Sequence, residues 1–234
     1  SSRRSAVGGK QSGLRFDRFF YRTHLQGRPG MTDAEPAVFI VDDDESVRKS
    51  LSRLLISAGH KIESFSSAID FLKRAPYDGP ACLLLDIRMP GLSGLELQDE
   101  LNRRGCDLPV IVITGHGDVQ TAVRAMKAGA FDFVEKPFND QLLLDMINKA
   151  VAASLQSSRE MTHQAEAQAR ANTLTPREKE VLELISVGEA NKRIAHTMGI
   201  SEKTVEAHRA KVMGKMQAKS LAELVKMVMI IDGD

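Results

Sequence analysis

Four apolar runs in this sequence each end at polar or charged residues. These residues are, in chain order, Asp42 with Asp43 and Asp44, then Asp86, Thr114, and Lys136 before Pro137. If the runs are strands of one parallel sheet, their ends meet at the edge where such sheets bind ligands. Carboxylates gathered there repel one another and stay ionised only beside a cation, and their hard oxygens suit Mg²⁺. The spacing therefore predicts a magnesium site at one sheet edge.

A phosphoryl group fits an edge of this kind, because Mg²⁺ bridges its oxygens and neutralises developing charge. An Asp carboxylate can act as nucleophile and take up the group as an acyl phosphate. Lys136 would supply a second positive contact, which a cis bond to Pro137 could aim, and the Thr114 hydroxyl a hydrogen bond. Each of these residues taken alone is more often part of a solvated loop or turn than of a functional site. The prediction therefore depends on their occurring together, in this order, at four strand ends.

The elements that would position these residues follow an alternating pattern. The expected strands are 37–41, 61–64, 81–85, 110–114 and 131–135, and the expected helices are 45–58, 66–74, 93–104, 118–128 and one from Asn139 past Val151. Strands with continuous apolar runs are covered on both faces. This alternation predicts an α/β fold with a parallel sheet, helices on both faces and right-handed crossovers.

The rest of the chain has a different pattern. Residues 152–172 contain no Gly or Pro and few apolar residues, which predicts a helical linker. This helix either pairs with a second copy through Leu155 and Met161 or is a solvated single helix. Beyond it, Thr175, Pro176 and Glu178 form a helix start signal, and four short helices follow.

The third of these helices, about residues 201–217, is basic. It is expected to carry Lys203, His208, Arg209, Lys211, Lys215 and Lys219 against Glu202 and Glu206, a net charge of +3 with His neutral. Val205, Val212 and Met216 share one face and are expected in the core. A charged helix is often only a solvated face, but the short helix and tight turn before it favour a helix-turn-helix that reads DNA.

Composition and charge agree with a globular chain of two domains. The 234 residues have a net charge of +1, which divides into +6 for residues 1–32, −6 for residues 33–157 and +1 for residues 173–234. No apolar run is long enough to span a bilayer. Cys82 and Cys106 have no metal or redox spacing and are expected to be inert thiols.

The first 32 residues lack a sustained period and an apolar signal-peptide core. They are expected to be a disordered or vector-derived extension, with Met31 as the natural start. The aromatic cluster Phe16, Phe19, Phe20 and Tyr21 keeps a basic, disordered arm as the alternative.

Residues 37–150 resemble the receiver domain of two-component response regulators. The matching segments are 41–43 (VDD), 84–91 (LLDIRMPG), 113–115 (ITG) and 135–138 (EKPF). The resemblance implies a flavodoxin-like sheet with strand order 2-1-3-4-5 and Asp86 as the phosphoryl acceptor. It also implies Mg²⁺ ligation by Asp43, Asp86 and the backbone carbonyl of Arg88, with Asp42 helping directly or through water.

By the same resemblance, Thr114 and Lys136 contact the phosphoryl group, and Thr114 and Phe133 form a switch pair. Phe133 has no hydroxyl, where many relatives have Tyr. The loop 115–118 (GHGD) and the run 125–130 (AMKAGA) place the receiver nearest the FixJ branch. His116 is interpreted as a loop histidine and not as a phosphodonor or ligand.

Residues 173–228 resemble the DNA-binding domain of NarL/FixJ (LuxR-type) regulators. The match includes 174–178 (LTPRE), 200–205 (ISEKTV), 208–209 (HR) and 221–225 (LAELV). The DNA-contact candidates are Asn191, Lys192, Lys203, Thr204, Glu206, Ala207, His208, Arg209, Ala210, Lys211 and Lys215. Of these, positions 206, 207 and 210 face bases in the family. A Glu can accept from cytosine and an Ala can meet a thymine methyl.

Together the resemblances imply a phosphorylation-controlled DNA-binding transcriptional regulator. It would be no enzyme beyond phosphorylation and dephosphorylation of its own Asp86. The expected domains are the extension 1–32, the receiver 33–151, the helical linker 152–172 and the helix-turn-helix domain 173–234. The expected partners are a sensor histidine kinase, double-stranded promoter DNA and, on phosphorylation, a second copy in a homodimer. RNA polymerase is a further candidate, no membrane is involved, and the expected location is the cytoplasm.

Two other functions share these features. A Mg²⁺-dependent phosphohydrolase with an Asp nucleophile would need a general acid, commonly an Asp two residues after the nucleophile, where this chain has Arg88. A constitutive DNA-binding protein would need no phosphoryl site, and the set Asp43, Asp86, Thr114 and Lys136 argues against that function.

Overall fold

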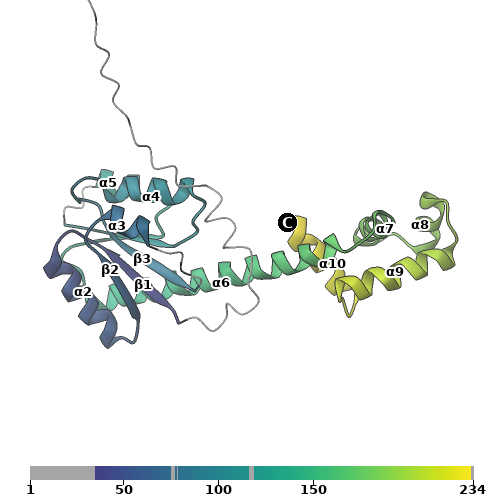
Figure 1. The fold of residues 1–234 in the computed structure, drawn as a ribbon, viewed down its shortest axis with the longest axis horizontal. Coiled ribbons are helices and arrows are strands. Elements are labelled where there is room, and N and C mark those ends of the chain that lie inside the picture. The colour runs from purple at the N-terminus through teal and green to yellow at the C-terminus, as the bar shows by residue number, and fades with distance from the viewer. Residues whose placement is uncertain (1–34, 75–76, 78, 116–118, 233–234) are drawn as a thin grey trace, which may run out of the picture.

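The chain folds into two bodies at opposite ends of one long helix. The computed structural model describes residues 35–74, 77, 79–115 and 119–232. In Figure 1, a sheet covered by helices lies at one end of α6 (Asp140–Asn172) and a group of helices lies at the other. We call these bodies the sheet domain, from β1 (Ala37–Val41) to the first half of α6, and the helical domain, from the C-terminal end of α6 to α10 (Leu221–Asp232).

The sheet domain contains five parallel strands in the order β2-β1-β3-β4-β5. The strands are β1 (Ala37–Val41), β2 (Lys61–Phe65), β3 (Ala81–Asp86), β4 (Val110–Thr114) and β5 (Asp132–Glu135). Every residue of β1, β3 and β4 is buried, as continuous apolar runs require in a sheet covered on both faces. The predicted fold class and strand order are confirmed, and β1 lies beside β3.

Helices cover both faces of this sheet. The helices α3 (Ala68–Lys73), α4 (Gly94–Arg103) and α5 (Val119–Lys127) lie over one face, and α2 (Glu45–Ser57) and α6 lie over the other (Figure 1). The two cores follow the alternation of side chains along each strand, so Val112 packs on one face and Ile111 on the other. Because all five strands are parallel, their carboxyl ends, which carry the candidate residues, lie at the same edge of the sheet.

The helix α6 joins the two bodies without interruption. The segments that the sequence separates at residue 152 form a single helix, because 152–172 holds no Gly or Pro to end it. Near its start Leu143 and Ile147 are buried in the sheet-domain core, and Ala81 N donates to Ser154 Oγ at 3.1 Å. Near its end Ala167 is buried and Ala171 packs on the core of the helical domain. Both domains are therefore attached to the same helix.

The helical domain consists of α7 (Pro176–Ser186), α8 (Asn191–Met198), α9 (Glu202–Met216) and α10 (Leu221–Asp232) around one apolar core. The capping box is present as the sequence predicts, with Thr175 and Glu178 exchanging side-chain and backbone hydrogen bonds. Gly199 takes the left-handed conformation, φ 66°, that turns the chain from α8 into α9. The pair α8 and α9 forms the predicted helix-turn-helix.

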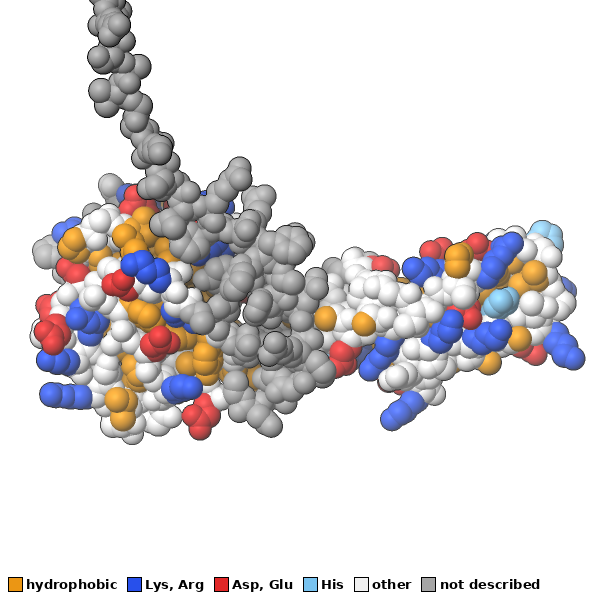
Figure 2. Space-filling view, viewed as in Figure 1, with side chains coloured by type: hydrophobic (Ala, Val, Ile, Leu, Met, Phe, Trp, Pro, Cys, Tyr) orange, Lys and Arg blue, Asp and Glu red, His pale blue; other side chains and the backbone are white. Residues whose placement is uncertain are grey.

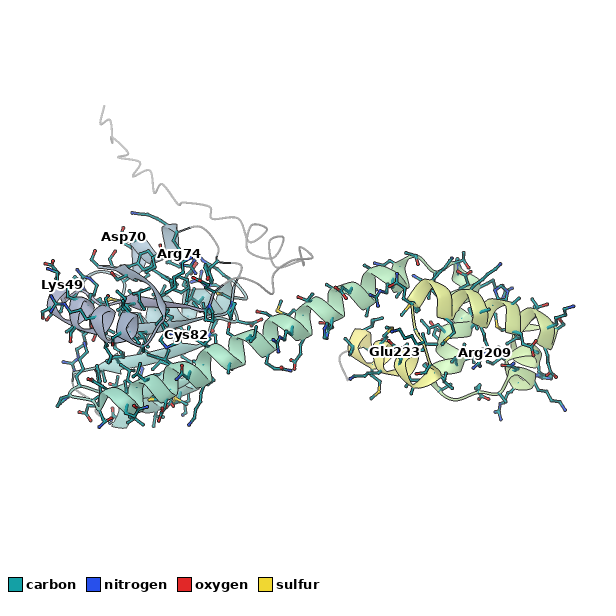
Figure 3. All side chains as sticks on the ribbon, turned by 90° about the horizontal axis from the view of Figure 1, so that it is seen from below. Lys49, Asp70, Arg74, Cys82, Arg209 and Glu223 are labelled. Atoms are coloured by element: carbon teal, nitrogen blue, oxygen red, sulfur yellow. The ribbon has the colours of Figure 1, made fainter. Side chains whose placement is uncertain are left out.

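Three further expectations concern Lys219, Cys82 and a membrane span. Lys219 does not belong to the basic helix, because Gln217 at φ 57° ends α9 and leaves it four basic and two acidic residues, a net +2. Cys82 lies inside the sheet domain (Figure 3), where burial raises the pKa of its thiol to about 12. Within the described residues, no helix has the length and apolarity needed to cross a bilayer.

Candidate functional site

Three of the residues chosen from the sequence meet at the carboxyl edge of the sheet. The ammonium of Lys136 lies 2.7 Å from Asp42 Oδ2 and 3.0 Å from Asp86 Oδ1. Both carboxylates are buried, at 3% and 8% exposure. They come from the ends of the adjacent strands β1 and β3, and Lys136 follows β5 with a cis bond to Pro137. One cation is thus shared by two carboxylates.

The backbone of two short loops fixes the carboxylates. Asp44 N donates to Asp42 Oδ1 at 2.9 Å, and Arg88 N donates to Asp86 Oδ2 at 2.7 Å. Each contact closes a local turn two residues long, which Asp favours after a strand. The second oxygen of each carboxylate is the one that meets Lys136, so both acids are held at two points.

The electrostatics of the site follow from burial. Burial raises the pKa of Asp86, and the neighbouring Asp42 adds to this, whereas the hydrogen bond and charge of Lys136 oppose it. Burial alone would lower the pKa of Lys136, but its contacts with Asp42 and Asp86 outweigh burial and raise it. The ammonium is therefore held charged beside an acid group that is costly to ionise.

The other two acids of the triplet are placed differently from Asp42. Asp43 is exposed at the edge. Asp44 caps α2, because its Oδ1 accepts from Ser46 N at 2.7 Å and from Val47 N at 3.3 Å. The carboxylates that pair with Lys136 are those of Asp42 and Asp86, and Asp44 serves as the N-cap of α2. An Asp directly before a helical run is a preferred N-cap, and this signal was present in the sequence.

Thr114 and Phe133 share one face of the sheet. Thr114 is the buried last residue of β4, and Phe133 lies in β5 opposite Val112, two residues before the partner of Thr114. Since side chains alternate along a strand, Thr114 lies on the same face as Val112. Phe133 packs on the core of that face, which α3, α4 and α5 cover. Thr114 and Phe133 therefore lie on the face of the sheet that α3, α4 and α5 cover.

The acids suit a hard divalent cation. Asp42 and Asp86 carry two negative charges against one ammonium, and oxygen ligands are those that Mg²⁺ takes. In the described part of the chain no three His, Cys, Asp or Glu side chains form a metal site by themselves. A bound ion would therefore need the Arg88 carbonyl or water besides the carboxylates. His116 lies outside the described residues.

A second candidate site is the outer surface of α9. Val205, Val212 and Met216 are fully buried, as expected. The opposite surface exposes Lys203, Thr204, Glu206, Ala207, Ala210 and Lys211, with His208 and Arg209 half-buried. Asn191 and Lys192 stand at the start of α8. Figure 2 shows basic side chains spread over the helical domain, and Figure 3 labels Arg209 there. Exposed Lys and Arg side chains of this kind are those that contact DNA phosphates.

Among the DNA-contact candidates, Lys215 is paired with other residues of the helical domain. Its ammonium lies 2.6 Å from the buried Glu178 carboxylate and 3.1 Å from the backbone carbonyl of Thr173. It therefore ties α9 to the start of α7 and to the end of α6. Since this ammonium is already paired within the domain, it is less available to DNA than those of the exposed Lys203 and Lys211. No local pattern signals the pair, because its members lie 37 residues apart.

The Glu178 pair predicts how the helical domain responds to acid. The hydrogen bond from Lys215 is the first cause that lowers the pKa of Glu178 from 4.5 to about 2. A carboxyl with a lowered pKa binds fewer protons in the folded state, so it stabilises the fold above its unfolded pKa. Stability should be lost as the pH falls from about 4.5 to about 2. The loss can be measured by the hydrogen-exchange protection of amides in α7 and α9 at a series of pH values.

Glu178→Gln should lose this part of the pH dependence, whereas Glu180→Gln, exposed on the same helix, should keep it. An acid response of Glu178→Gln equal to that of the wild type would contradict the role given to this pair.

Two family models match the chain. The model described as response regulator receiver domain matches residues 38–148. The model described as bacterial regulatory proteins, luxR family, matches residues 172–228. The first covers the strands that carry Asp42, Asp86, Thr114 and Lys136, and the second covers α7, α8, α9 and most of α10.

Curated relatives match across both domains. The chain is 47% identical over 193 residues to the transcriptional regulatory protein FixJ of Azorhizobium caulinodans, covering 82% of this chain and 92% of that one. It is 46% identical to FixJ of Rhizobium meliloti, covering 85% and 97%.

Solved structures agree with this. The response regulator StyR matches with a TM-score of 0.75 at 45% identity, over 83% of this chain and 98% of that one. Full-length FixJ from B. japonicum matches with a TM-score of 0.52 at 42% identity, over 87% and 100%.

Proposed function

This chain belongs to the FixJ-like response regulators, transcriptional regulators that join a receiver domain to a LuxR-type DNA-binding domain, and on this basis we propose that Asp86 is its phosphoryl acceptor. The observation that carries the proposal is the Lys136 ammonium held between the buried carboxylates of Asp42 and Asp86. A buried acid at a strand end, beside a fixed cation, is placed to receive an anionic group.

The phosphoryl donor is a phosphohistidine of a sensor kinase. An oxygen of Asp86 attacks phosphorus, the bond from phosphorus to the imidazole nitrogen breaks, and the electron pair returns to that nitrogen. Lys136 then pairs with the phosphoryl oxygens, and the Thr114 hydroxyl donates to one of them. Mg²⁺ supplies charge neutralisation when it is bound. The residues that would hold it are Asp42, Asp43, Asp86 and the backbone carbonyl of Arg88.

The switch follows from the shared face of Thr114 and Phe133. When Thr114 is drawn toward the phosphoryl group, space changes on the face where Phe133 packs, and α5 responds. The altered surface favours a homodimer of two chains. Two helical domains then engage two half-sites, and the second contact gains from the effective concentration that the first creates.

DNA reading is assigned to the outer surface of α9 and the start of α8. Lys192, Lys203, Arg209 and Lys211 contact phosphates, with Asn191, Thr204 and His208 beside them. Glu206, Ala207 and Ala210 face base edges, where a carboxylate can accept from cytosine and a methyl can meet thymine. Promoter DNA is thus the output partner, and RNA polymerase is a candidate to join it there.

The test compares one sample with and without beryllium fluoride and Mg²⁺, which together imitate a phosphoryl group on Asp. Sedimentation should change from monomer to dimer, and binding to DNA fragments selected from a random pool should tighten. Equal mass and equal affinity in both states would contradict phosphorylation control. Turnover of a small phosphoester with no change in DNA affinity would favour the phosphohydrolase instead.

The α9 assignment predicts a change in salt dependence. Lys203→Ala combined with Lys211→Ala removes two exposed cations, so the slope of log affinity against log salt should fall by about 2, at about 0.9 per phosphate contact. Random-sequence DNA suffices, because phosphate contacts carry no sequence information. Lys226→Ala, exposed on α10, is the control and should keep the slope. A slope unchanged in the double variant would remove these residues from the interface.

A further inference from the structure

We infer that Arg48 is a positioning residue of the phosphorylation site, and this inference rests on the proposed function. Arg48 is half-buried in α2, and its Nη1 donates to the backbone carbonyl of Asp42 at 2.6 Å. Strand β1 ends at Val41, so this carbonyl lies beyond the ladder of the sheet. A buried carbonyl there needs a partner from outside the sheet.

Arg48 completes the set of contacts that hold Asp42. The Asp42 N–H donates to the Phe65 carbonyl at 3.3 Å, and Asp42 Oδ1 accepts from Asp44 N at 2.9 Å. Asp42 Oδ2 accepts from Lys136 at 2.7 Å, and the carbonyl oxygen accepts from Arg48. Each polar atom of this residue has its own partner, and the partner of the carbonyl is a charged side chain that α2 brings in.

The position of Arg48 in α2 is explained by this contact. Side chains on a helix tilt toward its N-terminus, so the guanidinium reaches back from α2 over the end of β1. A cation near the N-terminus of a helix is unfavourable for the helix itself, which prefers acids there such as Glu45 and the cap Asp44. The hydrogen bond to Asp42, strengthened by the charge of its donor, offsets this cost.

The contact also orients Asp43. The carbonyl of Asp42 and the N–H of Asp43 belong to one planar peptide group, so a bond to the carbonyl fixes the plane from which the exposed Asp43 extends. Asp42 and Asp43 are both proposed ligands of Mg²⁺. Arg48 therefore sets their relative geometry by holding the backbone, without touching the phosphoryl group.

The experiment measures Mg²⁺ binding to the full chain in the absence of any phosphodonor. Titration calorimetry is suitable, because the chain has no Trp to report by fluorescence. Arg48→Met should weaken Mg²⁺ binding about tenfold, the size of one lost charge-assisted hydrogen bond. Phosphoryl uptake should be slow at low Mg²⁺ and recover at saturating Mg²⁺. Arg48→Lys should restore part of the affinity, and Arg53→Met, exposed on the same helix, should change neither quantity.

A nearby positive charge that did nothing else would have the opposite effect, since removing it would tighten the binding of a cation. Mg²⁺ affinity that is unchanged or tighter in Arg48→Met would therefore overturn the inference. If this variant does not fold, Arg48→Gln carries the same expectation and the same contrary outcome. A wild type that takes up no phosphoryl group with Mg²⁺ would instead overturn the proposed function.

Discussion

Asp86→Asn should abolish phosphoryl uptake, with a fall in initial labelling of at least about a thousandfold, as for removal of a nucleophile from a preorganised site. The Asn amide has nearly the shape of the carboxylate, so it can still accept from Arg88 N, but it does not attack phosphorus. Lys136 keeps its bond to Asp42. The fold should therefore survive while the chemistry is lost, and DNA affinity should no longer respond to a phosphodonor.

Asp44→Asn is the matched control. It replaces an Asp by an Asn, as Asp86→Asn does, but at a residue that caps α2. Asn is an equally good cap. Its labelling should stay within about twofold of the wild type, since capping is preserved. Labelling measured with a radioactive phosphodonor decides between these outcomes. Equal labelling of Asp86→Asn and the wild type would remove Asp86 from the acceptor role.

Gly94→Ala should destabilise the sheet domain by about 3 kcal/mol, at the upper end of the usual cost of overpacking. A Cβ on Gly94 would lie 2.2 Å from the Asp86 carbonyl oxygen and 2.9 Å from Ile87 Cα. Both are backbone atoms, which do not rotate away as a side chain would. Either α4 or the peptide of Asp86 must move, and the hydrogen bond from Gly94 N to Ile87 O, 3.0 Å long, is disturbed with it.

Replacing Gly by Ala at a second position, Gly214, should stabilise the protein. Gly214 lies within α9 with nothing near its Cβ position, so Gly214→Ala should stabilise the helical domain by about 0.5–1 kcal/mol through better helix propensity. Hydrogen exchange of amides in β3 and α9 reports the two domains separately. Gly94→Ala with the exchange rates of the wild type in β3 would show that α4 can move aside at no cost.

The fold and the centre of the site were predictable because they depend on periodicity. Continuous apolar runs identify buried parallel strands, and the residue after each run must lie at the carboxyl edge. Asp42, Asp86 and Lys136 meet there for this reason. The capping box at Thr175 and the turn at Gly199 could also be predicted from the sequence, since both are local patterns.

The contacts that the sequence left unpredicted join residues on different elements. The bond from Lys215 to Glu178 depends on how α9 packs on α7, and the closeness of Gly94 to Asp86 depends on how α4 meets β3. Periodicity states which face a residue occupies, but not which side chain of another element it meets. Asp44 is a case in which a local rule does apply, since an Asp directly before a helical run is a preferred N-cap and Asp44 caps α2.

Because α6 is unbroken, its length determines how the helical domain is rotated about the helix axis relative to the sheet domain. Ala150 is buried in the core of the sheet domain and Ala171 packs on the core of the helical domain, so the residues between them set a rotation as well as a length. Each residue added to a helix rotates the helical domain by about 100° relative to the sheet domain and advances it by about 1.5 Å. One added residue would therefore swing the DNA-reading surface to another side of the molecule. Seven would return it to within about 20°, displaced along the axis by about 10 Å.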